Sequence, residues 1–184
     1  MNNAPHPYYI LSMMLHYPGE SFKKTLSNDL PQLQDRYPQD AQGLSEFTQY
    51  VENEALADLQ ELYTKTFDIH AICNLDVGFV LFGEDYKRGE FLVHVKREHQ
   101  EADNPCGSEL PDHLPNLLNL LPKMKDQKLA AEMVQTFLIP AVDKMLKGFK
   151  ENGNIYAQPL KAIRDILKSD YVGAAMAPQE GVVG

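Results

Sequence analysis

Residues 109–115 (ELPDHLP) concentrate the side chains of this chain that are best suited to chemistry. Glu109 precedes Pro111, and Asp112 and His113 lie between Pro111 and Pro115. A leucine-rich run follows. A carboxylate beside a histidine is a pairing used in general acid–base catalysis. The prolines fix φ and disfavour the helical region for the residues before them, while Asp112 is a favourable N-cap. The segment therefore predicts a rigid turn that opens a helix and presents acids to a basic partner.

No second component of an active site accompanies this segment. The sequence contains no GxSxG, GxGxxG or P-loop motif and no Cys–His family signature. Gly83 and Gly89 are too isolated to form a phosphate loop, and adjacent acids such as Glu84 and Asp85 are expected by chance in an acidic chain. We therefore predict no catalytic residue. A helical enzyme with an unrecognised cofactor or metal stays open as one alternative.

The histidines and cysteines do not have the spacing of a metal site. His70 and Cys73 are three residues apart and could share a helix face, but strong zinc signals need paired CxxC or HExxH spacing. The sequence therefore predicts no metal site, and the candidates read as separate surface and core residues. These candidates are His70, Cys73, His94, His99, Cys106 and His113.

Two further segments are richer in aromatic and charged residues than an ordinary surface. They are residues 63–68 (YTKTFD) and residues 81–89 (LFGEDYKRG). Phe67 and Phe82 are expected more in the core than on a binding surface. Carboxylates are rarely buried unless they are paired, so Asp68 and Glu84 are expected to be exposed. We expect Arg88 to form a structural ion pair with Asp68, Glu84 or Asp85.

Composition limits the classes of protein to which the chain can belong. Its 184 residues suit one domain or at most two small ones, and 43% of them are hydrophobic. The net charge of −9 argues against nucleic acid as a partner. Two distant cysteines suit a reducing compartment. Neither a signal-peptide pattern nor a run of about 18 apolar residues is present. We expect a soluble, cytoplasmic protein that does not insert into membranes.

The apolar spacing is typical of helices throughout. Helices are expected over residues 8–15, after Ser21, on both sides of a break near Asn53, within residues 74–82, over residues 86–101, 114–124 and 129–150, and over residues 156–167. Pro140 should kink or split the longest of these. The predicted fold class is all-α, a single-domain helical bundle of roughly eight to ten helices spanning residues 1–172. Residues 173–184 form a Gly/Ala/Pro-rich tail that we expect to be disordered.

In order and spacing, these segments resemble those of the NarJ-like nitrate reductase molybdenum cofactor assembly chaperones. The resemblance rests on residues 9–18 (YILSMMLHYP), 59–68 (LQELYTKTFD), 81–89 and 109–115, and it covers most of residues 8–170. The trimethylamine-oxide and dimethyl-sulfoxide reductase chaperones are similar at a greater distance. The resemblance implies an all-helical, non-enzymatic protein that binds the N-terminal, often twin-arginine, leader of a molybdoenzyme catalytic subunit. It implies that the chaperone assists insertion of molybdopterin guanine dinucleotide into that client and binds no cofactor stably itself.

The sequence departs from the NarJ-like pattern at two places. His113 stands where NarJ-like proteins often carry an aromatic residue, and residues 70–74 (HAICN) are atypical. The client class therefore stays open: a nitrate reductase, or a related perchlorate, chlorate, selenate, dimethyl-sulfide or ethylbenzene enzyme. A non-enzymatic helical adaptor for another protein partner is the alternative function. A homodimer also stays open, because helical proteins with long connections can exchange domains.

A leader with arginines and an apolar stretch could fold as a helix in a groove of the chaperone. The expected floor is Phe67, Phe82 and the leucines after Pro115, with Pro111 and His113 in the same segment, and the expected rim is Asp68, Glu84, Glu109 and Asp112. Changing both Glu109→Ala and Asp112→Ala is then expected to weaken leader binding and leave the fold intact. For His113 two readings stay open, a pH-linked release of the leader and a hydrogen bond inside the loop.

Overall fold

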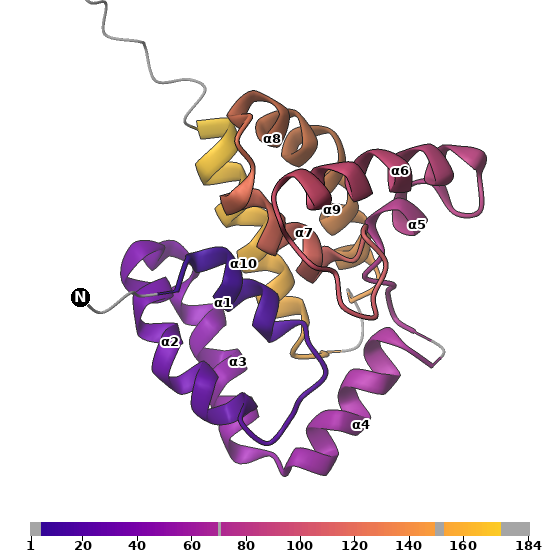
Figure 1. Ribbon diagram of the computed structural model, residues 1–184. Helices are drawn as coiled ribbons and strands as arrows, with labels where there is room; N and C mark the ends of the chain where they lie inside the picture. Colours follow the sequence, from indigo (N-terminus) through magenta and orange to yellow (C-terminus); the bar gives the residue numbers. More distant parts are fainter. Residues whose placement is uncertain (1–4, 70, 150–152, 174–184) are drawn as a thin grey trace, which may run out of the picture.

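The computed structural model describes residues 5–69, 71–149 and 153–173, and these residues form an all-α single-domain bundle (Figure 1). The predicted fold class is confirmed. The helices are α1 Pro7–Met14, α2 Phe22–Arg36, α3 Ala41–Asn53, α4 Leu56–Phe67, α5 Val77–Phe82, α6 Tyr86–Glu101, α7 Leu114–Leu120, α8 Gln127–Met133, α9 Ile139–Lys147 and α10 Ala157–Lys168. Short 3-10 turns are η1 Pro38–Asp40 and η2 Leu121–Lys123, and π-helical segments are η3 Val134–Leu138 and η4 Ser169–Gly173. His70 and residues 174–184 of the predicted tail lie outside the described residues.

Helix α10 lies in the middle of the bundle, between α3 on one side and α9 on the other, while α1 packs on α2 and α7 (Figure 1). The inward face of α10 carries apolar residues at helical spacing, and Leu160, Ile163 and Leu167 are fully buried. The η4 segment continues α10 and is held by Asp170, whose Oδ2 accepts hydrogen bonds from the hydroxyls of Tyr8 at 2.7 Å and Tyr37 at 2.8 Å. One carboxylate thus ties the end of α10 to α1 and α2.

The interruption expected at Pro140 is present as the π-helical segment η3 between α8 and α9. Proline lacks an N–H, and its ring collides with the carbonyl four residues earlier in a regular α-helix. The widened turn relieves this conflict, and the N–H of Ile139 bonds instead to the carbonyl of Val134, five residues back. The chain therefore stays helical across Pro140 with a local change in hydrogen bonding.

Helices α6 and α7, which border the candidate site, differ in how much of their surface is buried. Helix α7 is buried on nearly all sides, and Leu114, Leu117, Leu118 and Leu120 have no exposed surface. Helix α6 buries only one narrow stripe of its surface: Phe91, Val95 and His99. It therefore stands out from the bundle with accessible surface on both sides (Figure 1).

Within the parts of the chain that the structure describes, no helix has the length and apolar character needed to span a bilayer.

Candidate functional site

Asp112 lies in the interior and joins two segments that are far apart in sequence. A short antiparallel pairing connects Asp76 to His113, in which the N–H of Val77 donates to the carbonyl of Asp112 at 2.9 Å. The Asp112 side chain has no exposed surface, and its Oδ2 accepts a hydrogen bond at 3.0 Å from the N–H of Gly78 in the first turn of α5. Glycine is required there, because a Cβ would lie 2.7 Å from that same oxygen. Asp112 thus anchors the start of α5.

This placement corrects the cap predicted from the sequence. The residue before α7 is His113, and its side chain makes no capping hydrogen bond. Asp112 is turned toward α5 instead of the helix that follows it. Ser21, after which a helix was expected, also makes no side-chain capping bond to α2. Both helices begin near the predicted positions, but α7 is stabilised mainly by burial of its leucines.

Arg88 pairs with different carboxylates from those predicted. Its Nη2 lies 3.3 Å from Oδ2 of Asp76, and its Nε lies 3.8 Å from Oδ2 of Asp112. His113 completes the cluster, with its Nδ1 3.1 Å from Oδ1 of Asp76. Burial and the charge of Asp76 raise the pKa of Asp112, against the opposing effect of Arg88. The carboxylates named in the prediction do not pair with Arg88, and Asp85 instead caps α6 by accepting from the N–H of Lys87 at 2.9 Å.

A second polar network fixes the loop between α6 and α7. His99 is buried, its Nε2–H donates to the carbonyl of Pro111 at 2.9 Å, and its Nδ1 accepts from the amide of Asn104 at 2.9 Å. Asn116 of α7 donates from its amide to the carbonyls of Cys106 and Leu110, each at 3.1 Å. The loop is therefore held from both sides and presents its outer residues in a fixed conformation.

Acidification is expected to weaken this network. Burial, with a smaller effect of Lys123, lowers the pKa of His99 below its ordinary value of 6.5, so the unfolded chain binds this proton more readily than the folded one. The stabilising effect of neutral His99 is complete above about pH 6.5 and is lost as the pH falls below it. We expect His99→Gln to be less stable at neutral pH and to lose less stability on acidification. Urea denaturation at about pH 7.5 and 5.5 measures both, and equal losses in the two proteins would contradict the assignment.

Two exposed carboxylates, Asp68 and Glu109, form what we call the acidic pair. Asp68 directly follows α4, and Glu109 lies on the loop before α7. Burial and the charge of Glu109 raise the pKa of Asp68, while His113 opposes them, so the two carboxylates lie close enough to repel each other. Among the described residues neither makes an ion pair with a cation. The acidic pair is therefore available to a positively charged group from outside.

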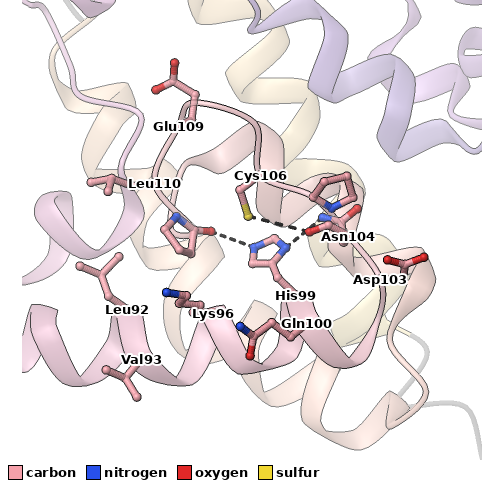
Figure 2. Close-up of a pocket in the computed structure, with 12 residues that line it drawn as sticks. Leu92, Val93, Lys96, His99, Gln100, Asp103, Asn104, Cys106, Glu109 and Leu110 are labelled. Atoms are coloured by element: carbon pink, nitrogen blue, oxygen red, sulfur yellow. Dashed lines mark hydrogen bonds between the residues drawn. The ribbon is translucent and has the colours of Figure 1, made fainter.

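A pocket of about 590 Å³ lies beside Glu109, between α6 and the fixed loop (Figure 2). Leu92 of α6 and Leu110 of the loop face each other across it, and Glu109 projects from the loop away from His99. Val93 and Leu110 are unusually exposed for aliphatic residues, at 69% and 44%. An apolar surface bordered by acids suits a peptide with apolar and basic side chains.

The other predicted site residues are not at this place. Phe67 is buried, with its ring centroid 4.9 Å from that of Tyr156, and the leucines of α7 are core residues, so none of them forms the floor of an open groove. Phe82 and the exposed Glu84 lie at the end of α5, and Phe82 lines a separate groove on the opposite side of α6. The structure thus brings Asp68, Glu109, Pro111 and His113 together and places Phe82 and Glu84 elsewhere.

The structure also shows residues that the sequence did not indicate as site residues. Leu92 and Val93 belong to α6 and line the pocket, but the apolar spacing of residues 86–101 predicted only a helix there and no binding surface. No signal in the sequence distinguished Val93 from an ordinary surface valine. Its role depends on the loop folding back beside α6.

The cysteines and histidines do not converge. In the described residues no three potential ligands from histidine, cysteine, aspartate and glutamate are grouped to hold a metal ion. Cys73 and Cys106 are free thiols, and burial raises the pKa of Cys73 to about 12, which disfavours the nucleophilic thiolate.

Fold and site together define an all-α protein whose elaborate polar clusters are structural and whose accessible acids lie next to apolar surface. A scan against protein-family models finds no match. The chain is similar to the "Probable nitrate reductase molybdenum cofactor assembly chaperone NarJ" of Bacillus subtilis (strain 168), with 27% identity over 161 residues. The alignment covers 86% of each chain. The resemblance to NarJ-like chaperones indicated by the sequence is thereby confirmed over most of the chain.

Proposed function

We propose that this chain is a cytoplasmic molybdenum cofactor assembly chaperone. Its client is the catalytic subunit of a nitrate reductase or of a related molybdoenzyme. The similarity to the Bacillus relative carries the proposal, because it extends over nearly the whole of both chains. The molybdopterin guanine dinucleotide belongs to the client, and the chaperone assists its insertion by holding the subunit before assembly or export.

The leader of the client is proposed to bind at the acidic pair. A guanidinium can pair with a carboxylate in a bidentate manner, and here it would also remove the repulsion between Asp68 and Glu109. The apolar part of the leader would contact Leu92, Val93 and Leu110 in the adjoining pocket. Pro111 contributes to the leader site through its carbonyl, which accepts a hydrogen bond from His99 and is held in place by it. His113 contacts Asp76 through its Nδ1 at 3.1 Å and is proposed to position the loop that carries Glu109.

Removing the acidic pair is expected to weaken leader binding about tenfold. Exposed ion pairs contribute about 0.2–1 kcal/mol each, so two of them change a dissociation constant by roughly one order of magnitude. The test is isothermal titration calorimetry of the client's leader peptide against Asp68→Asn with Glu109→Gln. The wild-type affinity should fall with added salt more steeply than the affinity of this variant.

A matched control removes the same charge elsewhere. Glu20→Gln with Asp35→Asn changes two exposed acids next to and within α2 and should leave the affinity unchanged. Equal weakening by both variants would show that only net charge matters. In the native host, the wild-type chain should co-purify an immature molybdoenzyme subunit, and truncation of that subunit's leader should abolish the association. Association that survives truncation would favour an adaptor for another part of the partner.

A further inference from the structure

A groove of about 640 Å³ runs along the side of α6 that faces away from the pocket of Figure 2. Its lining residues come from α6, from the end of α5 and from the continuous helical stretch formed by α8 and η3. Its lining is mainly apolar along the bottom and charged along both edges. The apolar lining residues are Phe82, Phe91, Val95, Leu129, Met133 and Phe137.

Three phenylalanines form a continuous aromatic floor. The ring centroids of Phe91 and Phe137 are 4.8 Å apart, and Phe82 lies 6.1 Å from Phe91 and 6.4 Å from Phe137. Tyr86 stands at one end with 72% of its surface exposed. Fixed aromatic side chains together with a flexible methionine, here Met133, are typical of surfaces that bind an apolar helix face.

The π-helical segment η3 shapes one wall of this groove. Because Pro140 forces the widened turn, Thr136 and Phe137 lie in a segment whose backbone hydrogen bonding differs from that of α8. Thr136 is exposed on the wall, while Val134 and Leu138 on either side remain buried. The segment is thereby anchored in the core and still turns Phe137 toward the groove.

The charges at the edges favour a basic occupant. Glu90 on α6 and Glu132 on α8 line the groove, one from each wall, and neither makes an ion pair among the described residues. Arg97 is already paired, with Glu98 at 3.2 Å and with Glu101 at 3.8 Å. The lining also includes His94 and Lys87, so Lys87 is the remaining full positive charge in that set.

We propose that this groove is a docking site for an amphipathic helix of a partner polypeptide, with an apolar ridge and lysine or arginine on both flanks. A third helix fits between two helices when its side-chain ridge enters their groove. The basic flanks would meet Glu90 on one wall and Glu132 on the other. This site is separate from the acidic pair, and the inference does not depend on the proposed leader contact.

The chain contains no tryptophan, which makes a direct binding assay available. The probe is a synthetic helix of leucine, alanine and lysine, about 18 residues or five turns long, with one tryptophan on its apolar face. Its fluorescence reports only on the peptide, and a blue shift marks burial. Two control peptides keep that tryptophan: a scrambled sequence without an apolar face, and a version with glutamate in place of lysine. Both should bind at least about tenfold more weakly than the basic helix.

Substitutions in the chain show where on its surface the synthetic helix binds. Thr136→Arg should obstruct the groove and weaken binding at least tenfold, whereas Val93→Arg on the opposite side of α6 should leave it unchanged. Glu90→Lys with Glu132→Lys should reverse the preference toward the glutamate peptide. Asp68→Asn with Glu109→Gln should leave helix binding unchanged, so failure here is distinguishable from failure of the leader site.

Three results would overturn the proposal. One is equal affinity for the basic and scrambled peptides. Another is equal weakening by Thr136→Arg and Val93→Arg. The third is a dimer in light scattering that must dissociate before the peptide binds, because a second copy would then be the natural occupant of the groove.

Discussion

Replacing Asp112 with alanine is expected to destabilise the protein by about 3 kcal/mol, the usual cost of removing one member of a buried charged cluster. The substitution leaves the N–H of Gly78 without its acceptor and removes the carboxylate that lies 3.8 Å from the buried Nε of Arg88. It also removes the side chain that anchors α5 to the loop before α7. Urea denaturation monitored by circular dichroism measures the loss as a lower midpoint at unchanged slope.

Two comparisons separate this effect from a simple loss of charge. Asp112→Asn retains an oxygen for the N–H of Gly78 and removes a carboxylate whose pKa burial and Asp76 raise, so it should be milder than alanine. Glu109→Ala removes an exposed acid and should change stability by less than about 0.5 kcal/mol. If Asp112→Ala were as harmless as Glu109→Ala, the anchoring role of Asp112 would be wrong.

The same argument changes the mutational test that the sequence suggested. Glu109→Ala combined with Asp112→Ala was expected to spare the fold, but Asp112 has no exposed surface and supports α5. Weaker leader binding in that double variant would then report partly on unfolding. Asp68 is the proper companion of Glu109, because both side chains are exposed and Glu109 contributes to the raised pKa of Asp68.

Local patterns were sufficient to predict most of the helices. Residues 86–101 have the expected bounds of α6, and the break between α3 and α4 follows Asn53 as expected. Apolar periodicity and proline act within a few residues of the chain, so they can be read without knowledge of the tertiary fold. Pro140 likewise predicted an interruption, although the sequence did not specify a π-helical turn.

The partners of the charged residues could not be predicted in this way. Arg88 was expected to pair with Asp68, Glu84 or Asp85, whereas its partners Asp76 and Asp112 meet only because the loop before α7 pairs with the segment before α5. The burial of Asp112 has the same origin, since acids are usually exposed and only the fold shows which one is enclosed. Of the candidate site, the exposure of Asp68, Glu84 and Glu109 followed from residue type. Residue type did not predict that Asp68 and Glu109 would lie together and Glu84 elsewhere.

Tyr156→Ala is expected to cost about 4 kcal/mol, within the range for removing a buried aromatic side chain. Tyr156 is 1% exposed at the start of α10, and its ring centroid lies 5.6 Å from that of Phe47 and 6.0 Å from that of Tyr63. It also meets Phe67 at 4.9 Å, so it joins α3 and α4 to α10. Tyr156→Phe keeps these ring contacts and should cost less than half as much. Chemical denaturation of both variants provides the comparison.

Helix α4 should be the element most affected by Tyr156→Ala, because it is held mainly through side chains. Besides the aromatic contacts, its anchors are the hydroxyl of Tyr63 on the carbonyl of Leu15 at 3.1 Å and the amide of Gln60 on the carbonyl of Pro18 at 2.9 Å. Native-state hydrogen exchange should therefore accelerate in α4 more than in the buried α7. Since Asp68 directly follows α4, looser anchoring would also spread the acidic pair and weaken leader binding in the folded variant. Uniform acceleration across all helices would instead mean that Tyr156 stabilises the bundle as a whole and does not position Asp68.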